Sequence, residues 1–431
     1  MRRPLLPAAL LLAAAPLAAQ SLDRTEARIR DQVRTMREEQ VAFLERVVNI
    51  PSGTMNHAGV RKTGDAFRAA LDSLGFRTRW AAMPDAVNRA GHLVAEHVGR
   101  PGRARILLIG HLDTVFEGPG QEFVRQDTIA LGAGSSDMKG GDVILLYALK
   151  AMHRAGALAD ANVIVVLTGD EESAGEPISI SRKDLMDAAR RSDVALAFEG
   201  GSRSIATVAR RGASTWVLTV TGTQAHSSGI FGQGAGYGAV FEAARILDEF
   251  RRELAGESGL TFNPALVLGG TDVTFDSAHV RGTAATKTNI VAPKTIVDGD
   301  LRFLSEEQKE RARARMRAIA SRSLPGTSAV IGFSDEYPAM STTPGNLRLL
   351  AVYDSVSRAL GYGPVEANDP TRRGAGDISF VAPIVDGLDG LGALGAGAHS
   401  PRESVNLAAL PMQTERAALL IYRLSRGPAK R

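Results

Sequence analysis

The stretch ARILLIGHLD, residues 104–113, decides the fold class of this chain. Its first six residues are apolar almost without alternation, which is typical of a β-strand covered on both faces. Residues 163–167 and 194–198 have the same apolar character. Helical periodicity marks residues 139–154 and 182–191, which lie between these expected strands. Strands that alternate with helices in this way predict an α/β fold with a mostly parallel sheet flanked by helices.

The N-terminal side adds elements of the same kind. We expect helices at residues 22–49 and 61–74 and a strand at residues 93–97. The first helix is expected to end before Pro51, because the residue before a proline avoids the helical conformation.

After Arg211 the pattern changes to that of a one-sided sheet. The expected order is strand, helix, strand, strand, helix, strand, at residues 213–221, 235–254, 265–275, 295–303, 306–322 and 328–333. This β-α-β-β-α-β order predicts an α+β, ferredoxin-like unit. Helical patterns resume at residues 346–360 and 413–425. We therefore expect a discontinuous catalytic domain, residues 21–210 and 337–431, that is interrupted by an inserted domain, residues 211–336.

Composition indicates an ordinary globular protein and argues against a nucleic-acid-binding one. The 431 residues are 44% hydrophobic and 23% charged, as in an ordinary soluble globular protein. The 51 basic and 47 acidic residues leave a net charge of +4 that is spread along the chain, and only 5% of the residues are aromatic. A nucleic-acid partner is therefore not expected.

Residues 1–20 have the pattern of a cleavable signal peptide. Arg2 and Arg3 precede an apolar run from Leu5 to Leu17, and small residues follow before Gln20. No second apolar run is long enough to span a bilayer, and the chain contains no cysteine. We expect a periplasmic or secreted protein with no stable membrane anchor; an uncleaved anchor is the alternative.

Five short segments place histidines or acids after a strand or in a glycine-rich turn. They are Gly110-His111-Leu112-Asp113, Gly134 to Gly141 with Asp137, Thr168 to Glu172 with Glu171 and Glu172, Phe198-Glu199-Gly200, and Gly397-Ala398-His399-Ser400. Any one of them alone is typical of an ordinary turn. Because ligands of open α/β sheets bind beyond the carboxyl ends of the strands, these segments are expected to converge.

Convergence of so many carboxylates predicts metal ions. Two unit charges about 4 Å apart repel by about 4 kcal/mol at an effective dielectric constant near 20, so bare clustered acids would take up protons or move apart. The carboxylates of Asp137, Glu172 and Glu199 and one hydroxide carry four negative charges, which two divalent cations balance. Histidine and carboxylate ligands without cysteine favour zinc, with cobalt or manganese as substitutes.

The five motifs, in this order and with the inserted domain between them, resemble those of the M20 family of zinc peptidases and deacylases, in particular its glutamate carboxypeptidase (carboxypeptidase G2-like) branch. The resemblance extends over essentially the whole chain after residue 20. It implies two zinc ions in each subunit, with Asp137 bridging them. One site would be completed by His111 and Glu199, the other by Glu172 and His399.

The same resemblance assigns the catalytic residues. Glu171 is expected to be the general base, and Asp113 to orient the ring of His111. At residues 374–377, Gly376 stands where the family has serine or threonine.

Three residues of the inserted domain resemble substrate-binding positions of the family: His226, Asn289 and Arg302. His226 resembles a histidine that reaches into the active site of a partner subunit, which implies a homodimer formed through the inserted domain. Arg302 could bind a substrate carboxylate through two hydrogen bonds. The alternatives are that Arg302 pairs with Asp300 or Glu306 at the surface and that His226 caps its own turn.

These observations predict an exported, two-zinc amidohydrolase or carboxypeptidase. Its expected substrate is a small peptide or an N-acyl amino acid, whose amide bond to a C-terminal amino acid, glutamate among the candidates, is attacked by an activated water. One alternative is a two-zinc aminopeptidase of the M28 type, which generally lacks such an inserted domain. The other is a periplasmic binding protein without catalytic activity on the same fold.

Overall fold

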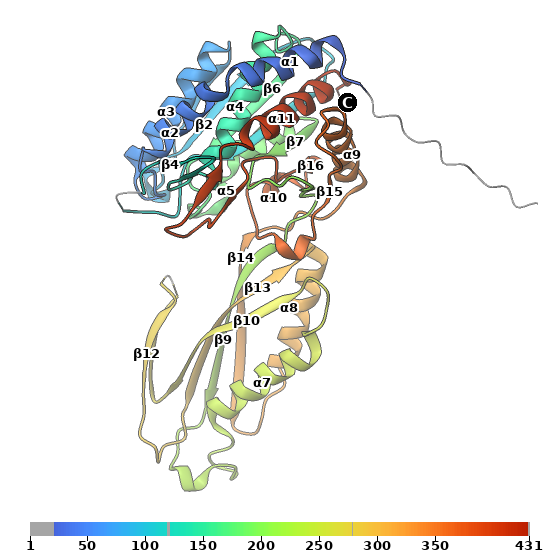
Figure 1. Cartoon of the computed structure of the whole chain (residues 1–431). Coiled ribbons are helices and arrows are strands. Elements are labelled where there is room, and N and C mark those ends of the chain that lie inside the picture. Colours follow the sequence, from blue (N-terminus) through green and yellow to red (C-terminus); the bar gives the residue numbers. More distant parts are fainter. Residues whose placement is uncertain (1–20, 119–120, 278, 430–431) are drawn as a thin grey trace, which may run out of the picture.

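The computed structural model describes residues 21–118, 121–277 and 279–429. Two sheets, each with helices packed on it and a hydrophobic core of its own, lie end to end (Figure 1). The predicted signal peptide, residues 1–20, lies outside the described residues. In the described part of the chain, no helix has the length and apolar character needed to cross a membrane.

The larger sheet has six strands in the order β1-β2-β6-β3-β7-β16. The strands are β1 (Arg77–Ala81), β2 (His92–His97), β3 (Arg105–His111), β6 (Asn162–Thr168), β7 (Val194–Ala197) and β16 (Gly387–Leu388). The four strands from β6 to β16 run parallel, whereas β1 and β2 are antiparallel to their neighbours. The predicted α/β class with a mostly parallel sheet is confirmed.

Alternate residues of the central strand β3 enter two separate cores. Ile106 and Leu108 pack with the layer of α1 (Arg24–Thr35), α2 (Arg37–Val48), α3 (His57–Ser73), α4 (Lys139–Arg154), α9 (Pro344–Ala359) and α11 (Leu410–Ser425). Leu107 and Ile109 pack on the other side, against α6 (Lys183–Arg190) and α10 (Ile378–Val381). Because both faces are covered, the strand is apolar from Ile106 to Ile109.

The second sheet is antiparallel, in the order β10-β13-β9-β14. Its strands are β9 (Gly212–Gly222), β10 (Thr261–Gly270), β13 (Lys294–Phe303) and β14 (Thr327–Tyr337). The two helices α7 (Gly238–Leu254) and α8 (Glu306–Ala320) pack on one face of this sheet, where Trp216, Leu218 and Val220 of β9 are buried. The predicted β-α-β-β-α-β order is present in this sheet.

Two local predictions were wrong. The helix expected at residues 22–49 is divided at Met36 into α1 and α2, where the Met36 N–H donates to the Val33 oxygen. The strand expected at residues 265–275 ends at Gly270, and the chain then forms a hairpin of β11 (Asp272–Asp276) and β12 (Arg281–Ala285). A Cβ atom at Gly270 would lie 2.6 Å from the Ala285 oxygen, so only glycine fits at this corner.

A small four-stranded sheet, β17-β18-β5-β4, lies beside the carboxyl end of the larger sheet. It consists of β4 (Val124–Gln126), β5 (Ile129–Leu131), β17 (Gly395–Ala396) and β18 (Ser404–Asn406). Pairing of β18 with β5 brings the C-terminal segment that carries His399 next to the loop that carries Asp137. Further short elements beside the larger sheet are α5 (Ile178–Ser181), β8 (Ile205–Ala206) and β15 (Glu366–Ala367).

Candidate metal centre

The five sequence segments converge at the carboxyl end of the larger sheet. His111 ends β3, Glu171 and Glu172 follow β6, and Glu199 follows β7. Asp137 lies just before α4, and His399 lies in the loop between β17 and β18. Ligand atoms of His111, Asp137 and Glu199 lie within 4.8 Å of one another, as do those of Asp137, Glu172 and His399 and those of His111, Glu171 and Glu172.

The carboxylate of Asp137 lies between the two histidine rings. Its Oδ1 is 3.3 Å from His111 Nε2, and its Oδ2 is 3.2 Å from His399 Nε2. Glu199 Oε1 lies 3.6 Å from His111 Nε2, and Glu172 Oε2 lies 3.2 Å from His399 Nε2. Asp137 is therefore shared by two groups of potential ligands, as a bridging ligand of two metal ions must be.

Two buried atoms at the centre have no hydrogen-bond partner among the described residues. They are His111 Nε2 and Glu172 Oε1. A buried polar atom without a partner is costly in free energy, so such atoms in a group of potential ligands fit a metal ion. The donor set of two histidines and carboxylates also fits zinc and related divalent cations.

His399 approaches from an exposed loop. Its backbone φ is 61°, in the left-handed region that residues other than glycine seldom adopt. Such a conformation has a cost of about 1–3 kcal/mol and persists only where the surrounding structure enforces it. Here it accompanies a ring whose Nε2 reaches both Asp137 and Glu172.

Asp113 connects the β3 and β6 loops. Its carboxylate accepts hydrogen bonds from Thr54 Oγ1 (2.7 Å) and from the backbone N–H groups of Glu171 (3.0 Å) and Glu172 (3.1 Å). His111 Nδ1 lies 3.1 Å from the Asp113 backbone oxygen and 3.4 Å from Oδ1. Asp113 is thus placed to fix both the His111 ring and the turn that carries Glu171 and Glu172.

The turn that carries Asp137 is held by a residue that the motifs did not indicate, Glu403. Its buried carboxylate accepts hydrogen bonds from the backbone N–H groups of Gly134 (2.8 Å), Ser136 (2.8 Å) and Asp137 (2.9 Å) and from Ser136 Oγ (3.0 Å). The one available signal was its position four residues after His399, which by itself does not distinguish it from a surface acid.

Buried charge distorts the acidities at this centre. Burial and the neighbouring Asp137 carboxylate raise the pKa of Glu199 to about 7. Burial, reinforced by Glu199, Asp377 and Glu172, raises the pKa of Glu171 well above its usual value. Hydrogen bonds to Asp137 and Glu172 raise the pKa of His399 to about 10. Without cations these groups therefore hold extra protons, which bound cations would replace.

The backbone of Glu171 is anchored by a buried network that includes the last residue of β14. Tyr337 Oη donates to the Glu171 backbone oxygen (2.7 Å) and accepts from Arg182 Nη2 (3.1 Å). The buried guanidinium of Arg182 also pairs with Asp170 (2.6 Å) and Asp377 (2.7 Å). Sequence reasoning did not identify this network, because its members are far apart in the chain.

The three predicted substrate-binding residues do not meet at this centre. His226 and Asn289 lie side by side: the Ser227 N–H donates to the Asn289 oxygen, and His226 bridges to Ile290. They lie beyond Gly222, where β9 ends, whereas Arg302 pairs in register with Ala213 at the other end of β9. At about 3.3 Å per residue, the two ends are roughly 30 Å apart.

The structure also contains the contacts that the alternative roles of His226 and Arg302 predict. His226 Nδ1 lies 2.8 Å from Ser228 Oγ and accepts from the Ser228 N–H, so the ring caps its own turn. Arg302 Nε donates to Asp300 Oδ2 (2.9 Å). In this single chain, neither side chain takes part in the metal centre.

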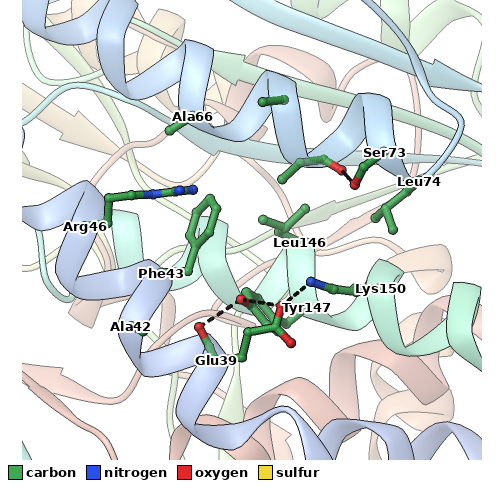
Figure 2. A pocket seen from close by; sticks show the side chains of 12 residues that line it. Glu39, Ala42, Phe43, Arg46, Ala66, Ser73, Leu74, Leu146, Tyr147 and Lys150 are labelled. Atoms are coloured by element: carbon green, nitrogen blue, oxygen red, sulfur yellow. Dashed lines mark hydrogen bonds and ion pairs between the residues drawn. The ribbon is translucent and has the colours of Figure 1, made fainter.

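A cavity of about 320 Å³ adjoins the metal centre. Asp137, Glu199, Arg373 and the backbone around Gly397 line it. Another hollow, of about 460 Å³, lies between α2, α3 and α4 (Figure 2), where Glu39 already binds Lys150, Arg154 and the Tyr147 hydroxyl. That hollow contains none of the candidate ligands.

Known proteins share both the sequence pattern and the fold. Residues 107–423 match the family described as peptidase family M20/M25/M40. Carboxypeptidase G2 of Pseudomonas sp. (strain RS-16) is 27% identical over 411 residues, which cover 90% of this chain and 89% of that protein. A succinyl-diaminopimelate desuccinylase of Acidovorax ebreus is 25% identical over 381 residues, which cover 84% of this chain and 92% of that one.

Solved structures resemble this fold as well. The YXEP protein of Bacillus subtilis, a dinuclear metal-binding peptidase of the M20 family, superposes with a TM-score of 0.65 at 14% identity and covers 91% of this chain and 99% of its own.

Proposed function

This chain belongs to the M20/M25/M40 peptidase family, and we propose that it is a two-zinc amidohydrolase that releases a C-terminal amino acid from a small peptide or an N-acyl amino acid. The observation that carries this proposal is the Asp137 carboxylate, which has one oxygen directed to each of two histidines. The family match sets aside the M28-type aminopeptidase. A binding protein without activity would be expected to lack a ligand or the base, whereas all of these residues are present here.

The residues of the centre have separate roles in metal binding, proton transfer and positioning. His111, Asp137 and Glu199 would hold one metal ion, and Asp137, Glu172 and His399 the other. The ions, when bound, supply the Lewis acidity that polarises the scissile carbonyl and acidifies the attacking water. Glu171, which lies in the same turn as Glu172, takes a proton from the water and delivers it to the leaving amine. Asp113 keeps the His111 ring and the Glu171 backbone in place.

The relatives support a carboxylate-bearing substrate. One is named a carboxypeptidase, and the other is named for removal of a succinyl group from diaminopimelate. Within the family we favour the glutamate carboxypeptidase branch, because the carboxypeptidase relative is 27% identical and covers 90% of this chain, against 25% and 84% for the desuccinylase.

The proposal includes a homodimer with shared sites. His226 and Asn289 lie at the far end of the inserted domain, roughly 30 Å from the end of β9 that adjoins the metal centre of the same chain. If they bind substrate, they do so in the centre of a second copy. A dimer formed through the inserted domain would bring the His226 of one copy to the substrate of the other.

The proposal also includes export to the periplasm or the medium. Its support is the basic and apolar pattern of residues 1–20. Intact-mass measurement of the protein recovered from the periplasm tests it: loss of a segment of about 20 residues is expected. A full-length chain retained in the cytosol would contradict export.

An activity screen tests the function. Chelator-treated enzyme is reloaded with zinc, cobalt or manganese and offered N-acyl amino acids and dipeptides, with products identified by mass spectrometry. Hydrolysis that the chelator abolishes and the metal restores is expected. Glu171→Gln serves as the control, and its turnover should fall about 100- to 10,000-fold while both metal ions stay bound. Wild-type turnover in that variant, or none in any reloaded sample, would refute the proposal.

A further inference from the structure

The cavity beside the metal centre is lined by a positively charged side chain, Arg373, to which none of the roles described above has been assigned. Asp137, Glu199 and Arg373 line this space of about 320 Å³ together with the glycine-rich backbone of residues 200–201 and 395–397. Arg373 belongs to the loop that precedes α10. It is half-buried and lines the wall of the cavity.

Arg373 is held by backbone rather than by an acid. Its Nη2 donates to the Gly200 oxygen, next to Glu199. Within residues 21–118, 121–277 and 279–429, it forms no ion pair with an acidic side chain. Other arginines near the centre are paired, Arg210 with Asp389 and Arg182 with Asp170.

A guanidinium held in this way retains donors for a ligand. One hydrogen bond to a carbonyl leaves most of its five N–H groups free, and their planar arrangement matches the two oxygens of a carboxylate. The nearby Asp137 and Glu199 carboxylates would be neutralised by the metal ions, so they would not compete for Arg373.

We propose that Arg373 binds a carboxylate of the substrate, carried on the acyl side of the scissile amide or on the side chain of the released amino acid. This inference rests on the proposed hydrolytic function and adds a specificity-determining residue to it. Arg302, the residue that the sequence offered for a carboxylate, is already paired with Asp300.

A purely structural role makes a different prediction. If Arg373 only holds the Gly200 carbonyl, and through it Glu199, its removal should slow every substrate equally. A substrate contact predicts a selective loss for substrates that carry the charge. The ratio of kcat/KM between charged and neutral substrates of the same shape therefore separates the two roles.

The test compares wild type, Arg373→Gln and the control Arg372→Ala, which changes the exposed neighbouring arginine. One arm uses N-succinyl against N-butyryl amino acids, and the other uses dipeptides with C-terminal glutamate against glutamine. Arg373→Gln should lower the charged-to-neutral ratio about 10- to 100-fold in one arm, which identifies where the carboxylate lies. Arg372→Ala should leave both ratios unchanged.

Binding provides a second readout that does not need turnover. In a Glu171→Gln background, calorimetry should show that succinate or glutamate binds about 10-fold more weakly after Arg373→Gln, while butyrate or glutamine is unaffected. Unchanged ratios in both arms, or an equal loss on neutral substrates, would overturn the inference. If wild type hydrolyses none of the substrates, the proposed function fails, and the binding experiment still decides the role of Arg373.

Discussion

Tyr337 Oη donates a hydrogen bond of 2.7 Å to the backbone oxygen of Glu171. Tyr337 is the last residue of β14, in the antiparallel sheet, whereas Glu171 follows β6 of the larger sheet. The contact therefore joins the end of one sheet to the proposed general base at the edge of the other. The placement of the base depends on how the two sheets meet.

Tyr337→Phe should lower kcat about 5-fold and leave KM nearly unchanged, because one buried hydrogen bond is worth about 1 kcal/mol. Steady-state kinetics on the reloaded enzyme measures this effect. Tyr362→Phe is the matched control, since Tyr362 Oη donates to Glu415 rather than to the centre. An unchanged kcat for Tyr337→Phe would show that the hydrogen bond does not position Glu171.

Asp137→Asn should impair both metal sites, because its two oxygens face different histidines. After dialysis, elemental analysis should find fewer than one metal ion per chain. Glu199→Gln is the comparison: Glu199 belongs to one of the two groups that share Asp137, so about one ion should remain. Two ions retained by Asp137→Asn would contradict a bridging role.

Glu403→Gln should weaken metal binding about 10- to 100-fold although Glu403 is in none of the ligand groups. The amide NH₂ cannot accept hydrogen bonds, so part of the set from Gly134, Ser136 and Asp137 is lost. The free energy of unfolding should fall by about 1–3 kcal/mol. Chelator competition and thermal unfolding test this, with the exposed Glu366→Gln as control. Wild-type metal affinity in Glu403→Gln would remove Glu403 from the support of the centre.

Metal-free protein should lose stability as the pH rises from 5 to 7. The folded-state pKa of Glu199 is about 7 against an ordinary 4.5, so the folded state binds more protons than the unfolded state in this window. That stabilisation is complete below pH 4.5 and is lost through pH 7. At about 1.4 kcal/mol per pH unit, Glu199 contributes about 3 kcal/mol.

Above pH 7 a buried lysine acts in the opposite direction. Burial lowers the pKa of Lys139 to about 7, so at this side chain the folded state then binds fewer protons than the unfolded state, whereas His399, with a pKa of about 10, still binds more. The measurement is therefore the melting temperature of chelator-treated protein between pH 5 and 7. Added zinc should raise the melting temperature more at pH 7 than at pH 5, because it replaces protons. A melting temperature that rises with pH in the chelated sample would contradict this prediction.

Mixed dimers test the shared site. His226→Ala and Glu171→Gln should each be nearly inactive alone. A dimer of one copy of each has one site in which an intact Glu171 meets an intact His226, so it should recover about a quarter to a half of wild-type activity. Co-expression with two affinity tags isolates this species. Activity no higher than that of either parent would show that His226 does not act in the partner's centre.

The local patterns were sufficient to predict most elements of the fold. The helix predicted at residues 139–154 has the observed limits, and four of the six strands of the larger sheet, β2, β3, β6 and β7, were predicted to within one or two residues, whereas β1 and β16 were not predicted. The fully apolar strands were informative because their burial on both faces leaves a signal in consecutive residues. Met36 gave no such signal, since it is neither glycine nor proline and is buried like Val33, one helical turn before it.

The residues of the metal centre were predictable for a similar reason. Each candidate ligand follows a recognisable strand or lies in a glycine-rich turn, and the parallel strands bring these ends together. Glu403, Tyr337 and Arg373 could not be found in this way. Their roles depend on contacts with backbone groups up to 269 positions away, as in the hydrogen bond from Gly134 to Glu403. Such partners are set by packing and leave no periodic trace in the sequence.

The position of Glu403 and His399 near the end of the chain has a consequence for biosynthesis. A nascent chain can complete β3, β6 and β7 while it is still attached to the ribosome, but it lacks one histidine and the support of the Asp137 turn until the last segment is released. The ligand group that contains His399 is therefore completed only after the others, and a chain truncated before residue 399 would lack both this histidine and α11, which packs in the main core. Hydrolytic activity thus reports completed synthesis.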